Sequence, residues 1–229
     1  MSPARETRDR IVDAAMELFT LQGYTATGLA QIAKKADCNA GSVYYFFPTK
    51  EAILAATLER RIELLRPEVL DPIWTGVDDP IERVFALLAG YRQMLAMTEF
   101  AHGCPIGNLV IEVAETHKHA RKLLCDNFDN WLAAVEACFA AAIEADKFPA
   151  DVDPRQLAIF VLTTMEGAVM LARSYRDFRA YDAAVSMLRD YVERLVGDAT
   201  GWSKPVGAPS PQHGERAARR TPPRRRRRR

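Results

Sequence analysis

Four consecutive aromatic side chains, at positions 44 to 47, form the stretch of this sequence best suited to contact a partner. On a helix, which turns by about 100° per residue, Val43 and Phe47 share a buried face and Tyr45 points the opposite way. The outer face also carries two small residues, Gly41 and Ser42. Such a face allows close approach and offers hydroxyl groups, which is the chemistry needed in a DNA groove. The alternative is that the aromatic residues only fill a small core.

Local signals place this stretch on the second of two short helices joined by a tight turn. Thr27 is a suitable N-cap for the first helix, Asn39 caps the second, and Pro48 ends it. This arrangement is typical of a helix-turn-helix, in which the second helix presents its N-terminal residues to the major groove. Positive charge for phosphate contacts comes from Lys34, Lys35 and Lys50.

The segment from 11 to 54 resembles the DNA-binding domain of the TetR family of bacterial regulators. It reads IVDAAMELFTLQGYTATGLAQIAKKADCNAGSVYYFFPTKEAIL. The matching features are an amphipathic first helix, a Gly-aromatic-Thr turn, an IA..A second helix, a G.[LV]Y..F third helix and a K..L fourth helix. The resemblance implies DNA-contacting roles for Thr27, Gln31, Asn39, Ala40, Gly41, Ser42, Tyr44, Tyr45 and Lys50.

Four positions depart from the residues that the family usually has there. They are Asp37, Cys38, Asn39 and Ala40. Ala40 stands where a longer polar residue often reads a base, and it offers only an apolar contact, for instance to a thymine methyl group. The departures therefore bear on base preference more than on affinity.

The whole sequence predicts an all-α fold, because helix formers dominate and no segment shows sustained strand alternation. After the first three helices, a fourth is expected from Lys50 to about Arg66, before Pro67. Longer helices are expected at 79–97, 105–115, 118–147, 153–176 and 180–196. The predicted domains are a helix-turn-helix DNA-binding domain (1–50), a helical ligand-binding and dimerisation domain (51–200) and a disordered Pro/Arg-rich basic tail (201–229).

Charge is distributed unevenly along the chain, although the net charge is only +1. Residues 201–229 hold ten Lys or Arg against one acid, whereas residues 51–200 hold 15 basic and 24 acidic residues. The two ends are therefore the parts suited to a polyanion. The N-terminus is too charged for a signal peptide, and no run reaches the roughly 18 apolar residues of a membrane span. These features predict a cytoplasmic protein with no membrane partner.

The four cysteines have neither a CxxC pair nor metal-site spacing, so we expect reduced thiols, no metal and no cofactor. An enzyme is the main alternative class of protein. The chain has only four His, and His117 and His119 diverge on a helix, so the sequence offers no metal pair there and no evident catalytic set. A second alternative is a sequence-nonspecific DNA-binding protein driven by the Arg tail, with a steep salt dependence and no preferred site. The other alternative for the tail is a solvated appendage without function.

A helix-turn-helix protein gains specificity by dimerising, so a dimer surface is expected. The last two helices offer apolar stripes that would form a four-helix interface with a second subunit. The stripes consist of Phe160, Thr164, Ala168 and Leu171 on the first helix, and Tyr181, Val185, Leu188, Val192 and Leu195 on the second. The alternative is that both stripes face the core of their own subunit.

The resemblance also implies a small-molecule pocket among the middle helices, whose occupation moves the DNA-reading domains apart. Candidate lining residues, each of which is also suited to an ordinary core, are Tyr91, Met94, Met97, Phe100, His102, Cys104, Phe128, Trp131, Met165 and Glu166. Glu166 needs a partner such as Arg173, a hydroxyl or a cationic ligand. Cys104 is either a buried structural thiol or, with a lowered pKa beside His102, a sensor of electrophiles or oxidants.

Together these features predict a dimeric, ligand-responsive transcriptional regulator, a repressor rather than an activator. It would bind a pseudo-palindromic operator and release it when a small-molecule inducer or a thiol-reactive signal favours another conformation.

Overall fold

The computed structural model describes residues 3–149 and 151–197, and all regular elements within these ranges are helical. The predicted tail, 201–229, lies outside the described residues. The elements in chain order are α1 (Pro3–Gln22), α2 (Leu29–Lys35), α3 (Ala40–Phe46), α4 (Lys50–Leu64), the π-helix η1 (Leu65–Leu70), α5 (Asp71–Trp74), α6 (Pro80–Met97), α7 (Pro105–Val113), α8 (Lys118–Glu144), α9 (Pro154–Tyr175) and α10 (Arg179–Gly197). The all-α prediction is confirmed.

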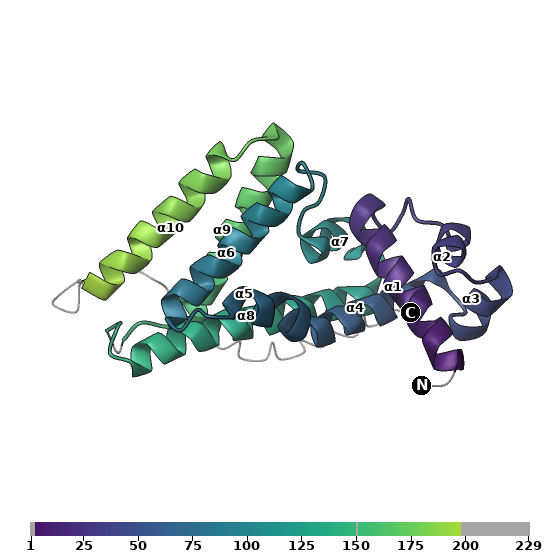
Figure 1. Cartoon of the computed structure of the whole chain (residues 1–229), viewed down its shortest axis with the longest axis horizontal. Helices are drawn as coiled ribbons and strands as arrows, with labels where there is room; N and C mark the ends of the chain where they lie inside the picture. Colours follow the sequence, from purple (N-terminus) through teal and green to yellow (C-terminus); the bar gives the residue numbers. More distant parts are fainter. Residues whose placement is uncertain (1–2, 150, 198–229) are drawn as a thin grey trace, which may run out of the picture.

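Figure 1 shows α1, α2 and α3 gathered at one end of the molecule, and α6, α9 and α10 at the other, with α4 and α8 running between them. The three N-terminal helices, here called the head, pack around a core that includes Phe19, Ile32, Val43 and Phe47. This core is completed by residues from α4, α7 and α8, among them Leu109 and Leu124. The head therefore packs directly against the larger part of the chain.

Side-chain caps are present at the N-termini of α3, where the sequence predicts one, and of α4, whereas α2 has none. Asn39 Oδ1 accepts a hydrogen bond from Ser42 N at 2.8 Å, and Thr49 Oγ1 accepts one from Ala52 N at 3.1 Å. The predicted N-cap role of Thr27 is wrong by one residue, because Gly28 is the N-cap of α2.

The α-helix α4 ends at Leu64, close to the predicted end near Arg66, but Pro67 does not interrupt the helical path of the chain. The chain continues from α4 through η1 into α5, and the Asp71 N–H bonds the carbonyl of Arg66 in the i→i+5 register. Proline interrupts an α-helix because it lacks an N–H and clashes with the preceding turn. The wider π-helical register accommodates Pro67 here, and such π segments are frequent at functional sites.

The larger part of the chain is a bundle centred on α8, which packs against α4, α6, α7 and α9. Among the described helices, α9 is the one that is long and apolar enough to cross a membrane. Of its most apolar 18-residue stretch, 39% is buried. The helix carries Glu166 and packs against α6, α8 and α10, which is the setting of a core helix in a bundle.

The apolar stripe on α10 faces the core of its own chain. Tyr181, Leu188 and Val192 are buried there, and the Tyr181 hydroxyl donates to the carbonyl of Leu88 at 2.6 Å. Ala168 on α9 is buried in the same core. A side chain buried within one subunit cannot line an interface between two, so assigning these four residues to a dimer surface is wrong.

Replacing Tyr181 by Phe tests this placement. The substitution removes a buried hydrogen bond and leaves the Leu88 carbonyl with one partner fewer, so the free energy of unfolding should fall by about 1 kcal/mol. Urea denaturation measures the change. Tyr44→Phe, which alters an exposed tyrosine, should leave the unfolding curve in place, and equal effects of the two substitutions would contradict the placement.

Candidate nucleic-acid interface and ligand cavity

The orientation predicted for α3 is confirmed. Val43 and Phe47 are buried in the head core, whereas Tyr45 is 80% exposed and Tyr44 is 57% exposed. The ring of Tyr45 meets the edge of Phe46 with centroids 4.9 Å apart. The outer side of α3 is therefore a free surface of small residues and tyrosine hydroxyls.

The N-terminus of α3 lies on the same free surface. Asn39, Ala40 and Gly41 are exposed, and Ser42 is half-buried. A Cβ atom on Gly41 would lie 3.1 Å from Asn39 Oδ1, so a side chain there would crowd the cap. These four predicted positions are thus brought together with both tyrosines.

Gln31 and Thr27 are placed differently from each other. Gln31 is exposed on α2, where its Oε1 accepts hydrogen bonds from Gly28 N at 2.7 Å and Gln22 Nε2 at 3.2 Å. Thr27 is only 1% exposed, and its hydroxyl donates to the Gly23 carbonyl at 2.6 Å. The structure therefore contradicts a direct side-chain contact from Thr27, because its hydroxyl is used within the head.

Lys50 stands at the first position of α4, and its side chain lies against the α1–α2 turn. Its Nζ is 4.2 Å from the centroid of the Tyr24 ring and 3.5 Å from the Thr25 carbonyl. Burial lowers the pKa of Lys50, and the charge of Glu112 works against that shift. Of the two lysines on α2, Lys35 forms an ion pair with Glu17 at 2.6 Å, whereas Lys34 is exposed.

Glu112 on α7 joins the bundle to the head, and nothing in the sequence pattern marked it. Its carboxylate accepts hydrogen bonds from the backbone N–H groups of Tyr24 at 2.7 Å and Thr25 at 2.5 Å. Gly23 adopts a φ of 83°, and a Cβ there would come within 2.8 Å of Glu112 Oε2. Burial raises the pKa of Glu112, but the hydrogen bonds from Thr25 and Tyr24 and the Lys50 charge outweigh it, so the pKa is lowered. Glu112 is thus an ionised carboxylate that holds the turn before α2 in place through two hydrogen bonds.

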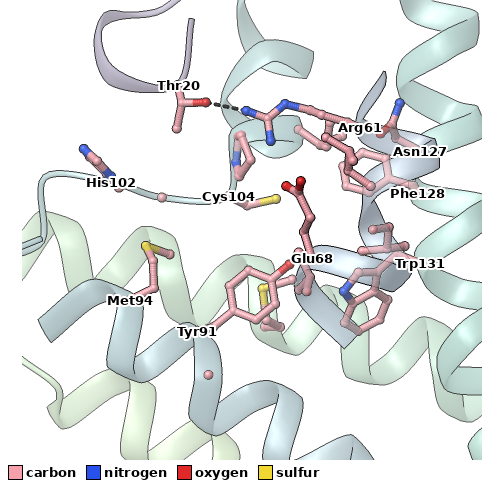
Figure 2. Close-up of a pocket in the computed structure, with 18 of the residues that line it drawn as sticks. Thr20, Arg61, Glu68, Tyr91, Met94, His102, Cys104, Asn127, Phe128 and Trp131 are labelled. Atoms are coloured by element: carbon pink, nitrogen blue, oxygen red, sulfur yellow. Dashed lines mark hydrogen bonds between the residues drawn. The ribbon is translucent and has the colours of Figure 1, made fainter. Parts of the chain in front are cut away.

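A cavity of about 430 Å³ lies where α1, α4, η1 and the bundle helices meet. Figure 2 shows Tyr91, Phe128, Trp131 and Glu68 arranged around it. Eight of the predicted lining residues do line it: Tyr91, Met94, His102, Cys104, Phe128, Trp131, Met165 and Glu166.

Two predicted lining residues lie elsewhere. Met97 is 77% exposed at the end of α6, and Phe100 packs on Phe178 with ring centroids 4.7 Å apart. Sequence reasoning missed the part of the wall that comes from α1, α4 and η1, together with part of α8, because helical spacing does not show which distant segments meet. This wall includes Met16, Thr20, Arg61, Leu64, Glu68, Val69 and Asn127.

Cys104 is the N-cap residue of α7 and lines the cavity. The alternative that its thiol has a lowered pKa is wrong. Burial raises the pKa of Cys104, and the neighbouring Glu166 carboxylate raises it further. The positive end of α7 does not offset these effects, although Gly107 N donates to Cys104 Sγ at 3.5 Å. The thiol is therefore protonated at neutral pH.

Glu166 has no salt bridge with Arg173, which sequence reasoning favoured as its partner. Arg173 instead donates to Asn108 Oδ1 at 2.9 Å and to the Ala101 carbonyl at 3.3 Å. Glu166 approaches α7 so closely that a Cβ on Gly107 would collide with its Oε2. Burial raises the pKa of Glu166, although the neighbouring Cys104 side chain opposes the shift.

Exposed apolar residues on α9 and α10 form a surface different from the predicted stripes. We call this the α9–α10 patch; it consists of Ile159, Phe160, Met170, Leu171, Met187 and Tyr191. The rings of Phe160 and Tyr191 meet edge to face at 5.5 Å, which joins the two helices. Among the predicted dimer residues, Phe160 and Leu171 belong to the patch, and Thr164, Val185 and Leu195 are half-buried.

Comparisons with known proteins agree with this geometry. Residues 11–57 match the family of bacterial regulatory proteins called tetR, and residues 80–188 match the tetracyclin repressor-like C-terminal domain. The HTH-type transcriptional regulator LmrA of Bacillus subtilis is 32% identical over 132 residues, which cover 57% of this chain and 70% of that relative. The uncharacterized HTH-type regulator YxaF of the same species is 29% identical over 177 residues, covering 77% of this chain and 90% of the relative.

Among solved structures, a TetR transcriptional regulator from Chloroflexus aurantiacus superposes with a TM-score of 0.72 at 27% identity, covering 85% of this chain and 98% of that one. The class defined by fold and site is a helix-turn-helix transcriptional regulator. The chain belongs to the TetR family.

Thiol reactivity tests the environment of Cys104. Because the thiolate is the reactive form, the raised pKa and burial should make Cys104 react with iodoacetamide at neutral pH at least about tenfold more slowly than the exposed Cys125. Mass spectrometry of timed digests measures both rates, with urea-unfolded protein as the control in which the rates converge. Equal rates in the folded protein would contradict the burial of this thiol.

Proposed function

We propose that this TetR-family chain is a dimeric repressor that binds a pseudo-palindromic DNA operator in the cytoplasm and releases it when a small molecule occupies the cavity. Residues 1–50 serve as its DNA-binding domain, and residues 51–200 bind the ligand and the second subunit. The matched relatives are regulators rather than enzymes, which favours this function over catalysis.

The observation that carries the proposal is the exposed outer face of α3. Val43 and Phe47 are buried behind the helix, whereas Tyr45 and the residues around Gly41 are exposed. The helix α3 itself lies at one end of the molecule (Figure 1). The face is small enough to enter a major groove, and its hydroxyl groups can bond phosphate or base edges. Lys50 supplies charge at the N-terminus of α4, where backbone N–H groups also favour an anion.

A path for the signal runs along α7. Its first turn carries Cys104, Pro105 and Ile106 in the cavity wall, and its last turn carries Glu112 on the head. A ligand that displaces the first turn therefore moves the carboxylate that holds Tyr24 and Thr25. Since these residues precede α2, the displacement changes the position of the helix-turn-helix.

The cavity favours a small-molecule signal over a thiol-reactive one. Cys104 is buried with a raised pKa, so it lacks the thiolate character and access of a reactive cysteine. The cavity, at about 430 Å³, lies within the size range of ligand pockets.

Dimerisation is assigned to the α9–α10 patch. Its side chains are large, apolar and exposed in the single chain, which is typical of a surface that a second subunit covers. Two-fold pairing through this patch gives a four-helix contact and two copies of α3 for successive grooves.

Tyr45→Ala tests the role of α3 in DNA binding. A lost groove contact costs about 1–3 kcal/mol, so affinity for the duplex that the wild-type protein selects should fall by roughly tenfold or more, with no change in melting temperature. Fluorescence anisotropy with labelled duplex measures the affinity. Met97→Ala, which truncates an exposed residue at the end of α6, outside the head, is the matched control, and unchanged binding of Tyr45→Ala would refute the proposed interface.

Phe160→Glu tests the dimer surface. A carboxylate in the centre of an apolar contact would be desolvated without a partner, so the dimer should dissociate at a concentration at least about tenfold higher. Sedimentation velocity over a dilution series measures this. Met97→Glu should sediment as the wild type does, and a dimer unaffected by Phe160→Glu would place the interface elsewhere.

A further inference from the structure

Two polar atoms in the cavity wall make no hydrogen bond of normal geometry among the residues that the structure describes, although the Tyr91 side chain lies beside Trp131 and the Cys104 side chain lies beside Glu166. They are Trp131 Nε1, which can only donate, and Glu166 Oε1, which accepts when ionised. Trp131 is 95% buried, with a residual exposure of 5%. Buried polar atoms are otherwise almost always paired, because an unpaired one keeps its desolvation cost. Both atoms are therefore places where a ligand would supply the missing partner.

The charges around the cavity are not balanced. Its wall holds two carboxylates, Glu68 and Glu166, and one guanidinium, Arg61. Arg61 is already engaged, because it donates to the Thr20 hydroxyl and to the Met16 carbonyl at 3.4 Å, both on α1. Glu166 has no basic side chain within ion-pair distance in the described part of the chain. The unmet charge in the wall is thus negative.

The rest of the wall suits a ligand whose apolar part is flat or flexible and lies next to a positive charge. Tyr91, Phe128 and Trp131 provide ring faces, and Met94 and Met165 provide polarizable thioethers that adapt to a ligand's shape. Aromatic faces attract an organic cation, most strongly in a desolvated site. Binding a cation also offsets the desolvation of the half-buried Glu166 carboxylate, which raises the pKa of that group.

Resting on the function proposed above, we infer that the cavity recognises an organic cation: an apolar or aromatic molecule with a protonated primary or secondary amine. The ammonium N–H donates to Glu166 Oε1, and an oxygen or nitrogen acceptor elsewhere on the molecule accepts a hydrogen bond from Trp131 Nε1. Arg61 stays with α1 and does not pair with the ligand.

Three dansyl compounds with the same fluorophore test this assignment. Dansylcadaverine carries an ammonium group, N-pentyl dansylamide is neutral, and dansyl-6-aminohexanoate carries a carboxylate; all three offer sulfonyl oxygens to Trp131. Titration of the full chain should show dansylcadaverine binding at least about tenfold more tightly than the neutral compound, because a charge-assisted hydrogen bond is gained. The carboxylate compound should bind most weakly.

Glu166→Gln should remove the preference for the ammonium group and leave the affinity of the neutral compound nearly unchanged. Glu63→Gln, which neutralises an exposed carboxylate outside the cavity wall, is the matched control and should keep the preference. Equal binding of the three probes, tighter binding of the carboxylate, or no binding of any of them would overturn the inference.

DNA binding by the same samples without probe separates this inference from the proposed function. A protein that selects a DNA sequence but shows no ammonium preference retains the proposed function and loses the inference. A protein that selects no DNA sequence loses the proposed function, whichever probe the cavity prefers.

Discussion

Burial of Val43 and Phe47 is the constraint on which the proposed DNA-reading surface depends. A helix of seven residues is too short to persist by itself in water, so α3 exists because these two side chains enter the head core and Asn39 caps its first turn. The same two contacts fix the rotation of the helix, and that rotation sends Tyr45 outward. Stability and function therefore use opposite sides of one element, and a change of core packing would redirect the surface that meets DNA.

Glu112 gives the head a mechanical connection to the bundle. One carboxylate satisfies two backbone N–H groups of the α1–α2 turn, and the close approach requires Gly23 in its left-handed conformation. The opposite end of α7 forms part of the cavity wall, so this helix connects the cavity to the α1–α2 turn. In the proposed function, a ligand in the cavity would act through this connection on the position of α2 and α3, as coupling between two sites requires.

Sequence reasoning succeeded where a property is local and failed where it depends on packing between distant segments. The faces of α3 and the caps at Asn39 and Thr49 follow from helical spacing and short-range hydrogen bonds. The stripe at Tyr181, Leu188 and Val192 was correctly apolar, but only tertiary contacts decide whether such a stripe meets its own core or a second subunit. Glu112 and Arg61 left no signal, because their partners lie 88 and 41 residues away along the chain. The position of Pro67 within the π-helix η1 likewise depends on the surrounding structure and not on the local sequence alone.

The symmetry of the selected DNA is the most direct test of the central claim, that two copies of α3 read a duplex together. Full-length protein is used to enrich duplexes from a random pool, and the enriched fragments are sequenced. The account predicts an inverted repeat whose half-site centres are separated by about one helical turn or a multiple of it. Fragments with no common sequence, or with a single half-site and no dyad, would contradict it.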